Sequence, residues 1–156
     1  MTVKQAGYSK EAFSLIEIMV AVGIMVIGLT AILASYANMF ILGDLARDLS
    51  RATNAARARM EEVKQVEFDS LDALNATTFD LEGFNVADAR GRVEVRNITG
   101  NSNLKEIRIV GCFRSRNRVV GEDANLNGAL DTEISEDKNN NGRLDSPVEL
   151  ITLLAD

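Results

Sequence analysis

The order of hydrophobic and polar residues divides the first 66 residues into two parts. Between Glu17 and Asp44 lie 26 residues without a charge, and Ile, Met, Val, Leu and Ala dominate them. As an α-helix this run would reach about 39 Å at ~1.5 Å per residue, more than the ~30 Å hydrocarbon core of a bilayer. The pattern predicts a membrane-spanning helix over residues 13–43. A cleaved secretory signal is the competing interpretation, but its apolar part usually covers only about 7–15 residues.

The second part is predicted to continue the helix as an amphipathic segment. After Gly43, apolar residues recur every three or four positions with charges between them: Leu45, Leu49, Ala52, Ala56, Met60, Val63 and Val66. This spacing is typical of a helix with one apolar face. No Pro interrupts residues 13–66, so we expect one helix of about 54 residues whose second part, residues 44–66, holds a globular head. A plain membrane anchor with a coiled-coil stalk is the alternative.

Residues 67–156 show the pattern of a small sheet. RVEVRNI (92–98) and KEIRIVGCF (105–113) alternate apolar and polar residues, and VELITLLA (148–155) gives a further strand. We expect TGNSN (99–103) to connect a hairpin and residues 68–91 to form a loop or short helix. One buried face is expected to carry Val93, Val95, Ile107, Ile109 and Phe113. The predicted fold class is α+β, with one long N-terminal helix packed on a small antiparallel sheet.

Charge is unevenly distributed over a chain whose net charge is -6. Residues 121–156 contain nine acidic and two basic residues, whereas residues 13–120 contain 13 of each. The acidity therefore needs a local explanation, such as bound cations. The chain has no His and one Cys, Cys112, which removes most catalytic and zinc-binding combinations. Enzymatic activity is not expected, and Cys112 is expected to be a small buried residue.

A repeat with a period of 14 residues lies in this acidic region, within an insert at residues 121–146. EDANLNGALD (122–131) returns as EDKNNNGRLD (136–145), and each copy fits the first nine positions of an EF-hand-type loop. Calcium takes roughly six to eight hard oxygen ligands, so the repeat predicts two calcium ions. The expected ligands are the side chains of Asp123, Asn125, Asn127 and Asp131 with the carbonyl of Ala129, and the side chains of Asp137, Asn139, Asn141 and Asp145 with the carbonyl of Arg143.

The repeat departs from an EF-hand at the last ligand position. Ile134 and Val148 stand where a bidentate Glu is usual, so shared carboxylates or another acid must complete each shell: Glu122, Glu133, Glu136 or Glu149. This ligand set predicts a modest affinity, with a Kd of about 10⁻⁴–10⁻³ M. Gly128 and Gly142 are expected to allow the sharp turns, and Leu130 and Leu144 to anchor the loops. A polar surface loop without an ion is the alternative.

The carboxylate of Glu17, at the start of the apolar run, is unusual. Its neighbours on both sides are apolar, and a carboxylate inside a spanning helix costs about 2.5–3.5 kcal/mol at the centre and less near an end. Its own spanning helix offers no cation, so we expect a partner from another molecule. The alternative places Glu17 at the level of the lipid headgroups.

The stretch AFSLIEIMVAVGIMVIGL (12–29) resembles the N-terminal segment of type IV prepilins and type II secretion pseudopilins. The resemblance implies that prepilin peptidase removes residues 1–12 by cutting between Ala12 and Phe13, that the new terminus is methylated, and that Glu17 pairs with the N-terminal amine of a neighbouring subunit. Where the family usually has Gly before the cut, Ala12 stands here, and Glu11 replaces the usual basic residue.

The resemblance implies a minor pilin or pseudopilin, most like PilV-type minor pilins or I-type pseudopilins, with ARARMEEVKQ (56–65) and VELITLL (148–154) as weaker matches. The implied partners are other pilins or pseudopilins, bound through the N-terminal helix, and an inner-membrane assembly platform. Lys4 and Lys10 precede the apolar run, which predicts a single-pass inner-membrane protein with a cytoplasmic N-terminus. The head, residues 67–156, is then periplasmic, or extracellular in a filament.

The sequence is also compatible with two functions other than a filament subunit. The first is a membrane-anchored, calcium-dependent adhesion or sensor module that does not polymerise. The second is nucleic-acid binding through RSRNR, residues 114–118. Three alternating arginines without stacking aromatic residues favour a solvated or acid-pairing face, so nucleic acid is not an expected partner.

Overall fold

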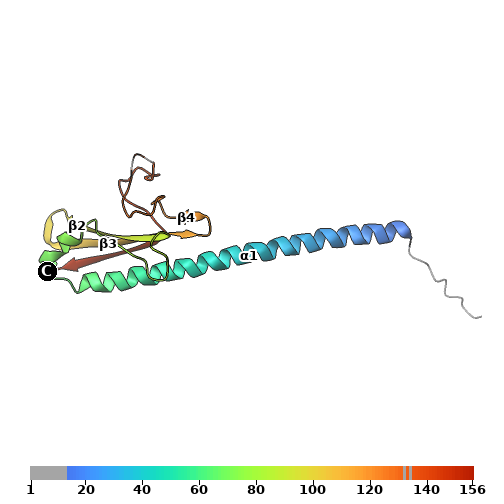
Figure 1. Ribbon diagram of the computed structural model, residues 1–156. Helices are drawn as coiled ribbons and strands as arrows, with labels where there is room; N and C mark the ends of the chain where they lie inside the picture. The colour runs from blue at the N-terminus through green and yellow to red at the C-terminus, as the bar shows by residue number, and fades with distance from the viewer. Residues whose placement is uncertain (1–13, 132, 134) are drawn as a thin grey trace, which may run out of the picture. The chain divides into compact units, whose positions relative to one another are not determined.

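A computed structural model describes residues 14–131, 133 and 135–156. In chain order its elements are α1 (Leu15–Lys64), the 3-10 helix η1 (Phe68–Leu74), β1 (Thr78–Phe79), β2 (Ala89–Ile98), β3 (Asn101–Ser115), β4 (Arg118–Val120) and β5 (Val148–Ala155) (Figure 1). The chain divides into two compact units, one reaching to Leu42 and one comprising Gly43–Asp156. The predicted α+β class, a long N-terminal helix with an antiparallel sheet, is confirmed.

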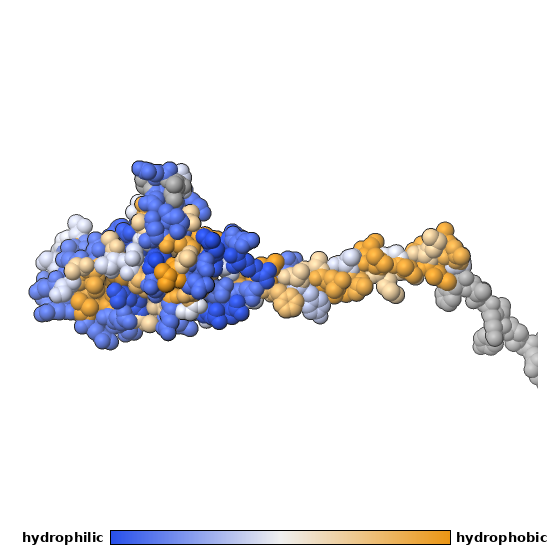
Figure 2. All heavy atoms as spheres, in the orientation of Figure 1, coloured by the Kyte–Doolittle hydropathy of each residue, from blue (hydrophilic) through white to orange (hydrophobic). Residues whose placement is uncertain are grey.

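Residues 15–42 of α1 expose apolar side chains along their whole length. Leu15 is 76% exposed and Phe40 69%, and the hydrophobic colouring of this segment is plain in Figure 2. By length and composition the helix is able to cross a membrane. The hydroxyl groups of Thr30 and Ser35 donate to backbone carbonyls one turn earlier, so these polar groups are satisfied within the helix itself.

The apolar stripe predicted for residues 44–66 packs on the sheet. Ala52 and Ala56 are fully buried and Val63 almost so, and the half-buried residues of the stripe join the same core. The α-helix ends at Lys64, two residues earlier than predicted. The next two N–H groups donate to carbonyls three residues before them, a tightening typical of helix ends. Phe13, the predicted first residue, lies outside the described residues.

Strand β3 is the centre of a five-stranded antiparallel sheet. One edge of β3 pairs with β2, which pairs in turn with β1. The other edge pairs with β5 along residues 104–111 and with β4 along residues 113–115. The three predicted strands are confirmed, and β2 and β3 extend beyond them. The β2–β3 turn is shorter than predicted, because Gly100 adopts a φ of 88° and β3 begins directly after it.

Both faces of β3 are buried. The face toward α1 carries the predicted apolar residues, none more than 5% exposed: Val93, Val95, Ile107, Ile109 and Phe113. The opposite face is covered by the acidic insert, whose Leu126 and Leu144 pack against Val110 and Cys112. In Figure 1 the insert rises from the sheet on the side away from α1. The sheet therefore separates a core formed with α1 from the loops of the insert.

Candidate functional site

The acidic insert folds into two loops with the same backbone turn, the first loop at residues 122–131 and the second at residues 136–145. Leu126 and Asn140 adopt φ values of 58° and 55°, and Gly128 and Gly142 adopt 78° and 70°. The members of each pair are 14 residues apart. Because a positive φ is uncommon outside glycine, its occurrence at both matched positions shows that the two copies share one conformation.

In the first loop the predicted ligands lie together. The carboxylate of Asp123 accepts the backbone N–H groups four and five residues further on, at 3.0 and 2.7 Å. The carboxylate of Asp131 accepts the side-chain amides of Asn125 at 2.7 Å and Asn127 at 2.8 Å. Ala129, whose carbonyl was a predicted ligand, donates its N–H to the side-chain oxygen of Asn127 at 2.7 Å. Every predicted residue of this set therefore borders the same turn.

The second loop repeats these contacts bond for bond. The carboxylate of Asp137 accepts the N–H groups four and five residues further on, at 3.0 and 2.8 Å. The carboxylate of Asp145 accepts the side-chain amides of Asn139 and Asn141, both at 2.7 Å. The N–H of Arg143 donates to the side-chain oxygen of Asn141 at 2.7 Å. The repeat in the sequence is thus a repeat of hydrogen bonds as well.

Two glutamates connect the loops, because each accepts hydrogen bonds from the backbone of the loop to which it does not belong. Glu136, which begins the second loop, accepts backbone N–H groups of the first loop at 2.8 and 2.9 Å. Glu122, which begins the first loop, accepts the matching N–H groups of the second loop at 3.3 and 3.2 Å. Each loop is therefore held in shape by the acid that opens the other.

These contacts give other roles to three of the four acids proposed to complete a metal shell. Glu136 is 1% exposed, and both of its oxygens accept backbone N–H groups. Glu122 has the matching role in the other loop. Glu149 pairs with an arginine of β3, and Glu133 is exposed. Of the two residues at the position of the usual bidentate Glu, Ile134 lies outside the part of the chain that the structure describes, and Val148 is the first residue of β5.

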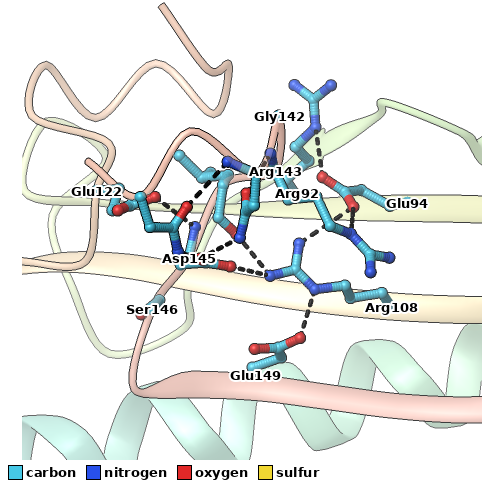
Figure 3. Close-up of polar contacts among 12 residues, drawn as sticks. Arg92, Glu94, Arg108, Glu122, Gly142, Arg143, Asp145, Ser146 and Glu149 are labelled. Atoms are coloured by element: carbon cyan, nitrogen blue, oxygen red, sulfur yellow. Dashed lines mark hydrogen bonds and ion pairs between the residues drawn. The ribbon is translucent and has the colours of Figure 1, made fainter. Parts of the chain in front are cut away.

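Arg108 joins the second loop to the sheet (Figure 3). Its guanidinium is 2% exposed and forms ion pairs with Glu94 at 3.1 Å, Asp145 at 2.8 Å and Glu149 at 2.5 Å. It also donates to the backbone carbonyl of Leu144 at 2.8 Å. Burial disfavours the charged form of Arg108, but the carboxylates of Glu149 and Glu94 outweigh it and raise the arginine pKa. The sequence pattern gave no sign of this role for Arg108.

Further arginines surround Glu94 beneath the insert, two from β2 and one from the second loop. Glu94 lies within 3.6–3.9 Å of the guanidinium groups of Arg92, Arg96 and Arg143. Arg92 also donates to the carbonyl of Gly128 in the first loop at 2.7 Å. Among the acids of the insert, Asp145 pairs with Arg108 of the sheet, so the protein itself supplies part of the counter-charge, a contribution that the sequence did not show.

The electrostatic surroundings of the two loops differ. Asp123 is 0% exposed, and burial raises the pKa of this carboxyl group against the backbone N–H groups that lower it. Burial also acts to raise the pKa of Asp145, but the side chains of Asn139, Asn141 and Arg108 outweigh it and leave that pKa below its usual value. An arginine thus supports the charged form of Asp145 in the second loop, whereas Asp131, the matching residue of the first loop, has no ion pair within the described residues.

The hydrophobic anchors of the insert are partly those predicted. Leu144 is 1% exposed, as expected, but Leu126 at 4% is the buried residue of the first loop, and the predicted Leu130 is only half-buried beside it. Cys112 is 0% exposed, which confirms the expectation of burial. Burial raises the pKa of this thiol to about 11.

The donor atoms of each loop are hard oxygens. The side chains supply two carboxylates and two amides per loop, a set that suits calcium in chemical type. The amide nitrogens face the last Asp of each loop, and the amide oxygens accept backbone N–H groups two residues further on. Within the described residues, no group of three or more His, Cys, Asp or Glu is arranged to hold a metal ion, so the asparagines and carbonyls are essential to any such site.

A second candidate feature lies in the first turn of α1. Glu17 is exposed there, and its N–H donates to the carbonyl of Ser14 at 3.0 Å. No ion pair to Glu17 occurs within the described residues. Ala12 and Phe13, the predicted cleavage site, lie outside them.

Comparison with known proteins identifies the N-terminal segment. Residues 5–33 match the family model described as the prokaryotic N-terminal methylation motif. The matched segment contains Ala12, Phe13 and Glu17 and supports the resemblance to type IV pilin-like prepilins. Curated proteins and solved structures give no match to the chain.

Proposed function

We propose that this chain is a minor pilin or pseudopilin, a subunit of a type IV pilus or of a type II secretion filament, of the PilV type or the I type. The observation that carries the proposal is the methylation motif over residues 5–33, placed at the start of a helix that is able to cross a membrane. A head with one helix and an antiparallel sheet agrees with a pilin-like subunit. Prepilin peptidase cuts between Ala12 and Phe13, and the amine of Phe13 is methylated.

In this function Glu17 has a defined electrostatic role. A carboxylate near one end of a spanning helix is costly alone, and so is the amine that processing creates. Paired across two subunits, each supplies the counter-charge of the other. The exposed position of Glu17 in the first turn of α1 leaves it free for such a neighbour. The pair therefore favours docking of one N-terminal helix beside another.

The subunit is held in the inner membrane until it is assembled. Residues 13–43 cross the bilayer once, with the N-terminus in the cytoplasm and the head in the periplasm. The assembly platform then moves the helix from lipid into a bundle of other pilin or pseudopilin helices. The continuous apolar exposure of residues 15–42 suits both surroundings, because lipid and neighbouring helices cover apolar surface equally well.

Two calcium ions stabilise the head in this proposal. The support is the pair of identical loops, each with two Asp and two Asn side chains around one turn. The ions would fasten the connection between β4 and β5, and so the last strand of the sheet. The loops join strands, not helices, so this is a structural clamp and not an EF-hand switch.

Replacing Glu17 tests the role of the carboxylate. Glu17→Ala is expected to be processed and inserted in the membrane but to be absent from filaments, since the neighbour's amine loses its partner. Ser35→Ala, in the same exposed segment of α1, is the matched control and should assemble. The measurement is the amount of subunit in sheared or cross-linked filaments, relative to the amount in membranes. Normal incorporation of Glu17→Ala would contradict the pairing.

The second candidate function is a membrane-anchored, calcium-dependent adhesion or sensor module. The observation that favours it is the compact head with its two matched loops, which forms a unit separate from the apolar helix. Such a module needs no cut at Ala12–Phe13 and no neighbouring subunit. Removal of residues 1–12 from the native chain therefore separates the two functions.

A further inference from the structure

The hairpin formed by β3 and β4 ends in a basic tip. Residues 114–118 contain three arginines and no acidic residue, in a chain with a net charge of -6. Arg114, Arg116 and Arg118 are all exposed. The register of the two strands places Arg114 and Arg118 one position apart, so they leave the hairpin on opposite faces. The tip therefore presents positive charge in several directions.

Hydrogen bonds fix this tip to the beginning of the soluble part of α1. The guanidinium of Arg116 donates to Asp44 Oδ2 from Nη2 at 2.7 Å and from Nε at 3.1 Å. The hydroxyl of Ser115 donates to Asp48 Oδ2 at 2.8 Å. The hydrogen bond from Arg116 lowers the pKa of Asp44. The end of the sheet that carries the hairpin is thus held beside Asp44.

The position of Asp44 along the chain relates the tip to a membrane. Asp44 directly follows Gly43 and is the first charged residue after Glu17. In a spanning helix such a residue lies where hydrocarbon gives way to headgroups, a layer about 5–7 Å deep on each side. Arg114 and Arg118 are each two residues from Arg116, about 7 Å of extended chain. This length is about the depth of the headgroup layer itself, so Arg114 and Arg118 are close enough along the chain for contact with lipid phosphates.

We propose that Arg114 and Arg118, on either side of the Arg116–Asp44 contact, bind the phosphate groups of anionic lipids and hold the head against the membrane surface before assembly. The proposal rests on the proposed function in one respect, that residues 13–43 span a bilayer. Guanidinium groups match phosphate oxygens with paired N–H donors. Basic residues close to a membrane with anionic lipids strengthen the binding of the protein to the membrane surface.

The acidic groups nearest the tip neutralise one of its three arginines, Arg116, and leave Arg114 and Arg118 charged and unpaired within the described residues. Asp44 already accepts two hydrogen bonds from Arg116, and Asp48 accepts one from Ser115. The guanidinium of Arg47 lies 3.6 Å from Asp44 and 3.7 Å from Asp48. Both carboxylates are thus paired within the protein, and Arg114 and Arg118 have no ion pair within the described residues.

The test uses the full chain reconstituted in lipid vesicles. A fluorescent label on the Asn117→Cys variant reports how close the hairpin tip lies to the lipid headgroups, because a nitroxide on the headgroups quenches the fluorescence only at close range. The native Cys112 is 0% exposed and does not compete for the label. A label on Ser102→Cys, near the other end of β3 and about 40 Å away along the strand, is the positional control.

We expect stronger quenching at position 117 in phosphatidylglycerol vesicles than in phosphatidylcholine vesicles, and no such difference at position 102. Arg114→Gln/Arg118→Gln keeps the Arg116–Asp44 contact and should lower the ratio of bound to free heads about 30-fold, from about fivefold per basic residue. Arg57→Gln/Arg96→Gln removes the same charge from exposed positions outside the hairpin and should leave the quenching unchanged.

Three results would overturn the proposal, and they differ from one another. An alkaline carbonate wash first shows whether the chain is inserted in the vesicles. If the chain stays inserted, equal quenching at position 117 in both lipids, or equal quenching of the two double variants, contradicts the contact of the hairpin with lipid but not the spanning helix. A chain that washes off contradicts the spanning helix, and with it both the contact and the proposed function. If duplex DNA binds through Arg114 and Arg118 and anionic lipid does not, the hairpin recognises nucleic acid and the lipid assignment is wrong.

Discussion

Replacing Arg108 by methionine should destabilise the head more than any other arginine replacement in the sheet. Arg108→Met removes the closest cation of Glu94, which is only 8% exposed. Breaking a buried charge network by removing one partner costs about 3–5 kcal/mol. The side chains of Asp145 and Glu149 keep 31% and 32% exposure, so water screens part of their loss. We therefore expect the free energy of unfolding to fall by about 3 kcal/mol.

The assay is urea-induced unfolding of a soluble fragment comprising residues 44–156, followed by circular dichroism at constant salt. Arg57→Met, at an exposed position of α1, is the matched control and should change the free energy of unfolding by no more than about 0.5 kcal/mol. Arg108→Met/Glu94→Met should recover part of the loss, since it also removes the stranded carboxylate. A cost for Arg108→Met below about 1 kcal/mol, equal to that of Arg57→Met, would refute the reasoning.

Two further predictions concern the insert and the thiol beneath it. Calcium at about 10 mM should raise the free energy of unfolding of the same fragment by about 1.4–2.7 kcal/mol per loop, for a Kd of about 10⁻⁴–10⁻³ M. Calorimetry with and without calcium measures this stabilisation, and an unchanged Tm would contradict the proposed calcium sites. Because burial raises the pKa of Cys112 to about 11, its alkylation in the folded protein should accelerate about tenfold per pH unit between pH 8 and 10. A thiol that reacts at pH 8 as fast in buffer as in urea would contradict its burial.

The elements with a long periodic pattern could be predicted from the sequence. The stripe from Leu45 to Val66 repeats over six turns, so its period identifies both the helix and the face that packs on the sheet. The alternation in residues 105–113 likewise identifies the face with Ile107, Ile109 and Phe113. β1 and β4 contain two and three residues, too few for a period to be visible.

The polar network under the insert could not be predicted in the same way. Alternation assigns Arg108 to the face away from α1, but only the fold shows that the insert covers that face and buries the guanidinium. The repeat of 14 residues predicts two similar loops, and this is what the backbone shows. It does not predict that Glu122 and Glu136 each accept backbone N–H groups of the other loop. Which loop each acid contacts depends on how the two loops pack together.

The measurement that tests the central claim most directly is the intact mass and N-terminal sequence of the chain isolated from its native membrane. The account predicts a chain that begins at Phe13, carries one methyl group on its amine and has lost residues 1–12. A native chain that still begins at Met1 would contradict the filament function and leave a membrane-tethered head in its place.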